Sequence, residues 1–177
     1  MVFYTPSHIA VAVLVILAAF TDCRSRRIPN WLTFSGFGAG LVLNGFTGGF
    51  AGLRSSALGA LLAFGVFVSL YCLRAMGAGD VKLMAAIGAL TGPAGWLLVF
   101  LATALAGGLL AVGTMIRNGR VQQTLWNTFF IINELVRLRA PFVRRRDLDV
   151  KSAHALNVPY GLAIAAGTLA CLFTARI

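Results

Sequence analysis

Long charge-free stretches are the feature that most restricts what this chain can fold into. Five such stretches contain no Asp, Glu, Lys or Arg: residues 3–21, 31–50, 55–73, 83–116 and 153–175. A helix of about 20 apolar residues crosses the roughly 30 Å hydrocarbon core of a bilayer, so each stretch is of membrane-spanning length. Only 11% of the residues are charged, whereas an ordinary soluble domain has about 25%. The sequence therefore excludes a water-soluble globule.

The fourth stretch is too long for one crossing. As a single helix its 34 residues would extend about 51 Å, and the sequence TGPAG at residues 91–95 interrupts it with glycine and proline. The first stretch has neither the basic start nor the small-residue cleavage site of a signal peptide, so we expect it to remain as a helix. The sequence predicts an all-α, polytopic integral membrane protein with six transmembrane helices, in which residues 1–177 form a single membrane-embedded domain.

The distribution of basic residues agrees with six crossings. Lys and Arg are enriched in the cytoplasmic loops of membrane proteins. Six crossings leave only Arg54 and Arg176 on the outer side, with both termini outside. The other thirteen of the fifteen basic residues then share the cytoplasmic side: Arg24, Arg26, Arg27, Arg74, Lys82, Arg117, Arg120, Arg137, Arg139, Arg144, Arg145, Arg146 and Lys151. A single crossing by residues 83–116 would divide these basic loops between the two sides.

Residues 117–151 form the longest polar segment, a basic cytoplasmic loop between spans five and six. Its apolar residues recur at helical spacing, which predicts an amphipathic helix lying on the inner leaflet: Leu125, Phe129, Ile132 and Val136. A basic tether without regular structure is the alternative. Because the net charge of +10 is held in short blocks between apolar stretches, we expect anionic inner-leaflet lipids as partners, and no nucleic acid.

The cysteines give no sign of a metal centre or a disulfide framework. Cys23, Cys72 and Cys171 are far apart, without a C-x-x-C pair or a histidine at ligand spacing. We expect neither a metal nor another cofactor.

Carboxylates are scarce, and this makes two of them conspicuous. Asp22 and Asp80 are the only acidic residues in the first 133 positions, and the topology places both at cytoplasmic ends of helices, where they can meet. A carboxylate near hydrocarbon is costly and indicates function. Two carboxylates that share a proton can activate water and polarise a carbonyl, as in an aspartic protease. The structural alternatives are a helix N-cap for Asp80 and a salt bridge from Asp22 to Arg24 or Arg26.

The sequences around the two aspartates favour the catalytic interpretation. Residues 21–30 read TDCRSRRIPN and residues 77–82 read GAGDVK. Together these motifs resemble the type IV prepilin peptidase family of G-x-G-D membrane aspartic proteases, and the chain is similar to the short form of the branch that serves Flp-type (tight-adherence) pili. VPYGLA at residues 158–163 also resembles a P-x-G-x-A pattern of the family. In the first motif, we expect Asn30 to cap a helix that begins at Trp31.

The resemblance implies an aspartic endopeptidase in the bacterial inner membrane that removes the short basic leader of type IV (Flp-like) prepilins. Its active site would face the cytoplasm, with Asp22 and Asp80 as the catalytic pair and Gly77 and Gly79 in the active-site loop. Lys82 and Arg24 are candidates to bind a glutamate of the substrate; the alternative is that they extend toward lipid phosphates. We also expect no N-methylation, because long members of the family carry that activity with an amino-terminal domain that this sequence lacks. The oligomeric state is not indicated.

Other classes of function compete with this interpretation. The two carboxylates could serve a proton- or cation-coupled transporter, although such groups usually lie near mid-membrane in repeated halves. A non-catalytic subunit of a pilus or secretion assembly would tolerate Asn at both positions. A thiol protease using Cys23 and His154 is a further alternative. A presenilin-type protease also carries G-x-G-D, but is expected to have its first aspartate after a tyrosine and within a span.

Overall fold

The computed structural model describes residues 6–73, 76–117, 119 and 160–174. In this part of the chain the secondary structure is helical, without strands, and comprises α1 (Pro6–Ser25), α2 (Asn30–Cys72), α3 (Ala78–Arg117) and α6 (Tyr160–Thr174). α1, α2 and α3 are long and apolar enough to cross a membrane, and α6 is a shorter apolar helix. The prediction of an all-helical membrane protein is confirmed at this level. The proposed amphipathic helix around Leu125–Val136 lies outside the described residues.

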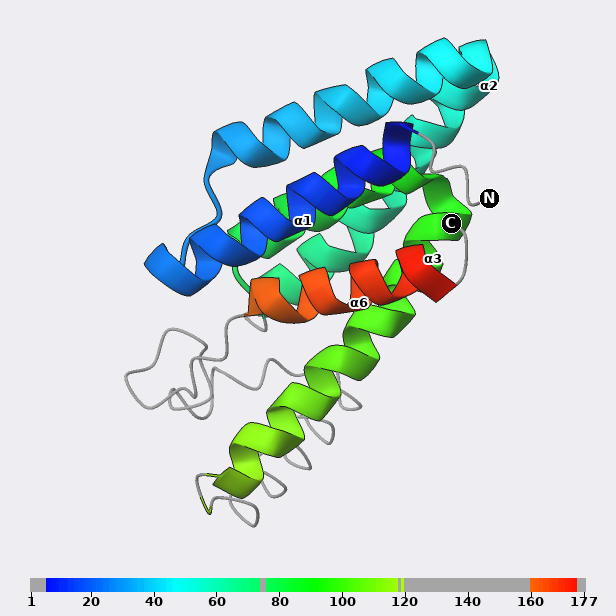
Figure 1. Cartoon of the computed structure of the whole chain (residues 1–177). Helices are drawn as coiled ribbons and strands as arrows, with labels where there is room; N and C mark the ends of the chain where they lie inside the picture. Colours follow the sequence, from blue (N-terminus) through cyan, green and yellow to red (C-terminus); the bar gives the residue numbers. More distant parts are fainter. Residues whose placement is uncertain (1–5, 74–75, 118, 120–159, 175–177) are drawn as a thin grey trace.

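Glycines bend α2 and α3. Gly49 has φ 57° and ψ −141°, and Gly92 has φ 68° and ψ 178°; glycine adopts a positive φ without the steric penalty that a side chain brings. At Gly49 α2 folds back on itself, so that its first arm (residues 30–48) and its second arm (residues 50–72) form a hairpin (Figure 1). The interruption expected within residues 91–95 is therefore present at Gly92. The turn that joins the second and third apolar stretches lies at Gly49, which is near the end of the second stretch.

Two polar side chains of α2 compensate for the bend in α3. Pro93 has no N–H to donate, so the carbonyl of Ala89 loses its usual partner within the helix. Ser56 Oγ donates to the Ala89 oxygen at 2.6 Å and Asn44 Nδ2 donates to the same oxygen at 2.8 Å. Asn44 Nδ2 also lies 3.2 Å from the oxygen of Leu90. These polar residues occur within apolar stretches because they donate hydrogen bonds to backbone carbonyls, which lipid chains cannot do.

α3 is the central element and contacts α1, α2 and α6. Small residues let the backbones approach closely, as is common where helices associate in membranes. A Cβ built on Gly59 would collide with the carbonyl oxygen of Gly88, and one on Gly167 would lie 2.5 Å from the backbone nitrogen of Thr103. These contacts fix the second arm of α2 and the helix α6 against α3.

Candidate active site

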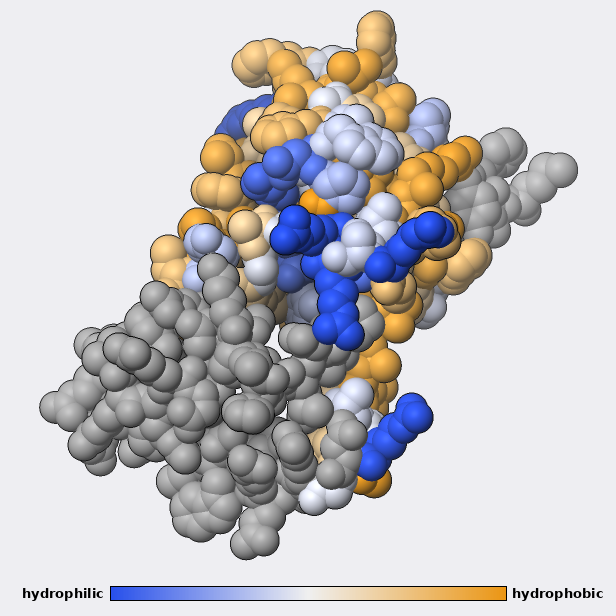
Figure 2. Space-filling view, turned by 90° about the vertical axis from the view of Figure 1, so that its left-hand side faces the viewer, coloured by the Kyte–Doolittle hydropathy of each residue, from blue (hydrophilic) through white to orange (hydrophobic). Residues whose placement is uncertain are grey.

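Three helix ends meet at one end of the bundle. The carboxyl end of α1 carries Asp22, the first turn of α3 carries Asp80, and α6 begins with Tyr160 and Gly161. In Figure 1 these ends lie on the same side of the molecule. Figure 2 views this side and shows hydrophilic side chains gathered in one part of it. The exposed arginines 24, 26 and 27 follow Asp22 directly in the chain, so the site adjoins a basic surface.

Asp22 is held by the backbone of α6. Its Oδ2 accepts a hydrogen bond from the amide of Gly161 at 2.9 Å, across 139 residues of sequence. A Cβ on Gly161 would lie 2.8 Å from that oxygen, so the close approach needs a residue without a side chain. Within the described part of the chain Asp22 thus binds this amide instead of forming the salt bridge to Arg24 or Arg26 that the sequence left open.

Asp80 is fixed by the turn that begins α3. It is the third residue of the helix, and its Oδ2 accepts from the amide of Gly77 at 3.3 Å. The carbonyl of Gly77 in turn accepts from the amides of Asp80 and Val81. This is half of a capping box, in which the third helical residue reaches back to the cap residue. The N-cap interpretation of Asp80 is therefore wrong in detail, because Gly77 occupies the cap position.

The two glycines that the sequence places in an active-site loop lie in different elements. Gly77 precedes α3, whereas Gly79 is the second residue of that helix, so the expected loop is wrong for Gly79. A Cβ on Gly77 would lie 3.3 Å from Asp80 Oδ2, whereas a Cβ on Gly79 would lie 3.3 Å from the Cβ of Ile28. Gly77 therefore adjoins the carboxylate, and Gly79 lets the start of α3 pack against the segment between α1 and α2.

Electrostatic interactions connect the residues of the three helices. The charge of Asp22 acts on Asp80, and the charge of Asp80 acts on the half-buried Tyr160. Two negative charges in a poorly solvated site repel each other strongly, so ionising both carboxyl groups costs more free energy than ionising one. The arrangement therefore disfavours the state in which both carboxyl groups are ionised.

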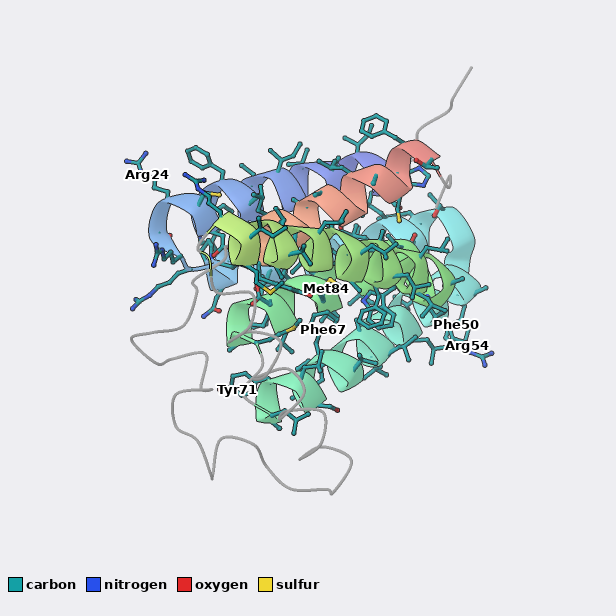
Figure 3. The ribbon with its side chains drawn as sticks, turned by 90° about the horizontal axis from the view of Figure 1, so that it is seen from below. Arg24, Phe50, Arg54, Phe67, Tyr71 and Met84 are labelled. Atoms are coloured by element: carbon teal, nitrogen blue, oxygen red, sulfur yellow. The ribbon has the colours of Figure 1, made fainter. Side chains whose placement is uncertain are left out.

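Lys82 and Arg24 take up positions apart from the carboxyl pair. Lys82 Nζ donates to Asn30 Oδ1 at 2.9 Å and lies 5.9 Å from the ring centroid of Phe34, both on α2. Arg24 is exposed and extends outward at the end of α1 (Figure 3). In the described residues neither cation contacts Asp22 or Asp80.

The expected cap at Asn30 is wrong. α2 begins at Asn30, and Pro29 occupies the cap position with φ −69°, ψ 141° and no side-chain hydrogen bond to the helix. The side chain of Asn30 is instead the acceptor for Lys82.

Tyr160 and Gly161 join the site although the sequence did not single them out as site residues. The sequence signal that could have identified them was the YGLA pattern, which was part of the family resemblance but was given no role for either residue.

Metal binding finds no support in the described residues. No group of three or more His, Cys, Asp or Glu side chains that could hold an ion lies within residues 6–73, 76–117, 119 and 160–174. His154 of the alternative thiol site lies outside the described residues.

Comparison with known proteins agrees with the two aspartate motifs. Residues 9–112, which include Asp22 and Asp80, match the type IV leader peptidase family. The chain is 34% identical over 110 residues to a prepilin leader peptidase/N-methyltransferase of Aeromonas hydrophila and 33% identical over 110 residues to one of Aeromonas salmonicida. Each alignment covers 58% of this chain but only 38% of the relative's length. No solved structure matches the chain.

Proposed function

The chain belongs to the type IV leader peptidase family, and on that premise we propose that it is a membrane aspartic endopeptidase that removes the basic leader of a type IV, Flp-like prepilin. The observation that carries the proposal is that the end of α1 with Asp22 and the first turn of α3 with Asp80 lie at the same end of the bundle, within reach of each other's charge. Both lie within the residues that match the family.

The chemistry follows from one proton shared by two carboxyl groups. The ionised carboxylate takes a proton from water as the water oxygen attacks the scissile carbonyl carbon, and the protonated carboxyl donates to the carbonyl oxygen. The tetrahedral intermediate collapses when the carbon–nitrogen bond breaks and the leaving nitrogen receives a proton from the pair. No metal or other cofactor is needed for this reaction.

Backbone amides orient both carboxyl groups. The Gly161 amide holds Oδ2 of Asp22 and the Gly77 amide holds Oδ2 of Asp80, so among the described residues the second oxygen of each, Oδ1, is left for water or substrate. Such fixed geometry supports catalysis because the reacting groups need little reorganisation. Tyr160, which precedes Gly161 and lies within reach of the charge of Asp80, can donate a hydrogen bond to the substrate backbone.

The membrane arrangement that suits this function has six crossings. α2 with 43 residues and α3 with 40 residues would extend about 60 Å or more if straight, twice the hydrocarbon thickness. The bends at Gly49 and Gly92 let each supply two crossings, and α1 and α6 supply one each. The basic surface beside Asp22 then faces the cytoplasm, both termini lie outside, and the bacterial inner membrane is the site of action.

A cleavage assay tests the proposal. Membranes that contain the chain are incubated with a Flp-type prepilin, and the product is sized and its new amino terminus sequenced. A shortened product that has lost the basic leader is expected from these membranes and not from membranes without the chain. A transporter or a non-catalytic assembly subunit would leave the prepilin intact, and that result would contradict the proposal.

A further inference from the structure

A second candidate site lies on the α2 side of α3. Here the structure has a cavity of about 230 Å³ whose walls come from both arms of α2 and from the first turns of α3. Its lining residues are mostly apolar and include three phenylalanines: Thr33, Phe34, Phe37, Phe64, Lys82 and Ala85. Phe34 is 65% exposed and Phe64 is 48% exposed, so the cavity opens toward the surroundings of the bundle.

Lys82 is the charged residue of this lining, and its charge is not balanced in the described part of the chain. Its hydrogen-bond acceptor, Asn30 Oδ1, belongs to a neutral amide, and its other neighbour is the ring of Phe34. An ammonium group at the edge of an apolar cavity attracts an anion, because neither partner supplies negative charge.

The cavity is polar at one end and apolar below it. Asn30 begins α2, and Phe37 lies seven residues further along the same helix, which is about 10 Å deeper. The ammonium of Lys82 is at the level of Asn30. The site therefore offers a cation beside the basic end of the bundle and aromatic rings in the direction of the membrane interior.

A substrate held at the carboxyl pair does not account for this cavity. Residues two apart on a helix point about 200° away from one another, so Asp80 and Lys82 face opposite sides of α3. Asp80 lies within reach of the charge of Asp22 and acts on Tyr160, whereas Lys82 contacts Asn30 and Phe34 of α2.

We propose that this cavity binds one anionic phospholipid, whose phosphate contacts the Lys82 ammonium and whose acyl chain lies among Phe34, Phe37 and Phe64. The inference depends on the membrane location of the chain and not on its peptidase activity. Charge complementarity favours a phospholipid, because its anionic phosphate suits the ammonium and its acyl chain suits the apolar cavity. Phospholipids also surround an integral membrane protein on all sides.

Lipid retention measures this binding. The purified protein is equilibrated in vesicles of equal parts phosphatidylglycerol and phosphatidylcholine, and the lipids that remain bound after extraction are counted by native mass spectrometry. The wild type is expected to retain one phosphatidylglycerol with roughly fivefold preference over phosphatidylcholine. Lys82→Gln abolishes the preference, Lys82→Arg preserves it, and Ala85→Trp reduces retention of both lipids because the indole fills the cavity.

Arg54→Gln is the matched control. Arg54 is an exposed cation of α2 far from Arg24 and the basic end (Figure 3), so its replacement should leave retention unchanged. Thermal unfolding of each variant in phosphatidylcholine alone shows whether the fold is intact. The proposal is overturned if folded Lys82→Gln keeps the phosphatidylglycerol preference, or if Ala85→Trp keeps the bound lipid. If Ala85→Trp keeps the lipid and also raises the KM for prepilin, the cavity is a peptide-binding surface and not a lipid site.

Discussion

At the scale of single residues, one added carbon at Gly161 should disturb the catalytic carboxylate directly. A Cβ there would lie 2.8 Å from Asp22 Oδ2 and 3.0 Å from its Cβ, so Gly161→Ala must displace the carboxylate. A displacement of about 1 Å can reduce the rate of a reaction by roughly 100-fold. We expect a loss of that order in prepilin cleavage, measured as initial rate in membranes that contain equal amounts of protein.

Gly108→Ala is the control for this substitution. Gly108 is also helical, and a Cβ there would meet nothing within 4 Å, so this variant should cleave at the normal rate. Normal cleavage by Gly161→Ala would show that the hydrogen bond from the Gly161 amide does not position Asp22.

The sequence predicted some site residues and not others for a physical reason. Asp22 and Asp80 stood out because a carboxylate is rare beside hydrocarbon, and that property belongs to each residue alone. The part played by Tyr160 and Gly161 depends on how α6 packs against α1, which no local pattern specifies. The orientation of Lys82 toward α2 likewise follows from the side of the helix on which it lies.

At the scale of helices, the bend in α3 depends on hydrogen bonds donated by α2. Ser56→Ala and Asn44→Leu each remove a donor to the Ala89 oxygen. We expect each substitution to lower the free energy of unfolding by about 1 kcal/mol. The double variant should lose more than the sum, because the carbonyl then has no side-chain donor. Equilibrium unfolding in mixed micelles measures this loss.

Thr47→Ala provides the comparison for these variants. Thr47 is an exposed polar residue of α2 whose hydroxyl donates to Leu43 O of its own helix. Its replacement should change the stability little. Equal stability of the wild type and the Asn44→Leu/Ser56→Ala double variant would contradict the role assigned to these donors.

Helix boundaries show where counting charge-free residues succeeds and where it fails. The interruption near residue 92 was predictable because glycine and proline act locally on the backbone. The start of α3 was not, because the helix begins at Ala78 and so includes Asp80 and Lys82, whereas the charge-free stretch begins at residue 83. A first helical turn accepts charged residues, since its side chains reach the polar end of the bundle.

At the scale of the whole molecule, the proposed topology places Arg27 and Gly48 on opposite sides of the membrane. Starting from a variant in which Cys23, Cys72 and Cys171 are replaced by alanine, single cysteines are introduced as Arg27→Cys and Gly48→Cys. A membrane-impermeant maleimide should label the cysteine at position 48 in intact cells. The cysteine at position 27 should react only after permeabilisation, because the proposed topology places the basic end in the cytoplasm.

Labelling of position 27 in intact cells would reverse the orientation and move the carboxyl pair to the outer side. The cysteine-free protein serves as the control for background labelling. It should also retain prepilin cleavage, since no cysteine takes part in the proposed reaction.

The central claim is that Asp22 and Asp80 act as one catalytic unit, and the rates of prepilin cleavage by Asp22→Asn, Asp80→Asn and the double variant test it most directly. Residues that act together are strongly non-additive, so each single change should reduce the rate by roughly 10⁴-fold and the double variant should be scarcely slower. All three proteins should remain inserted in the membrane at wild-type levels. Normal cleavage by either single variant would contradict the account, because the remaining carboxylate would then be working without its partner.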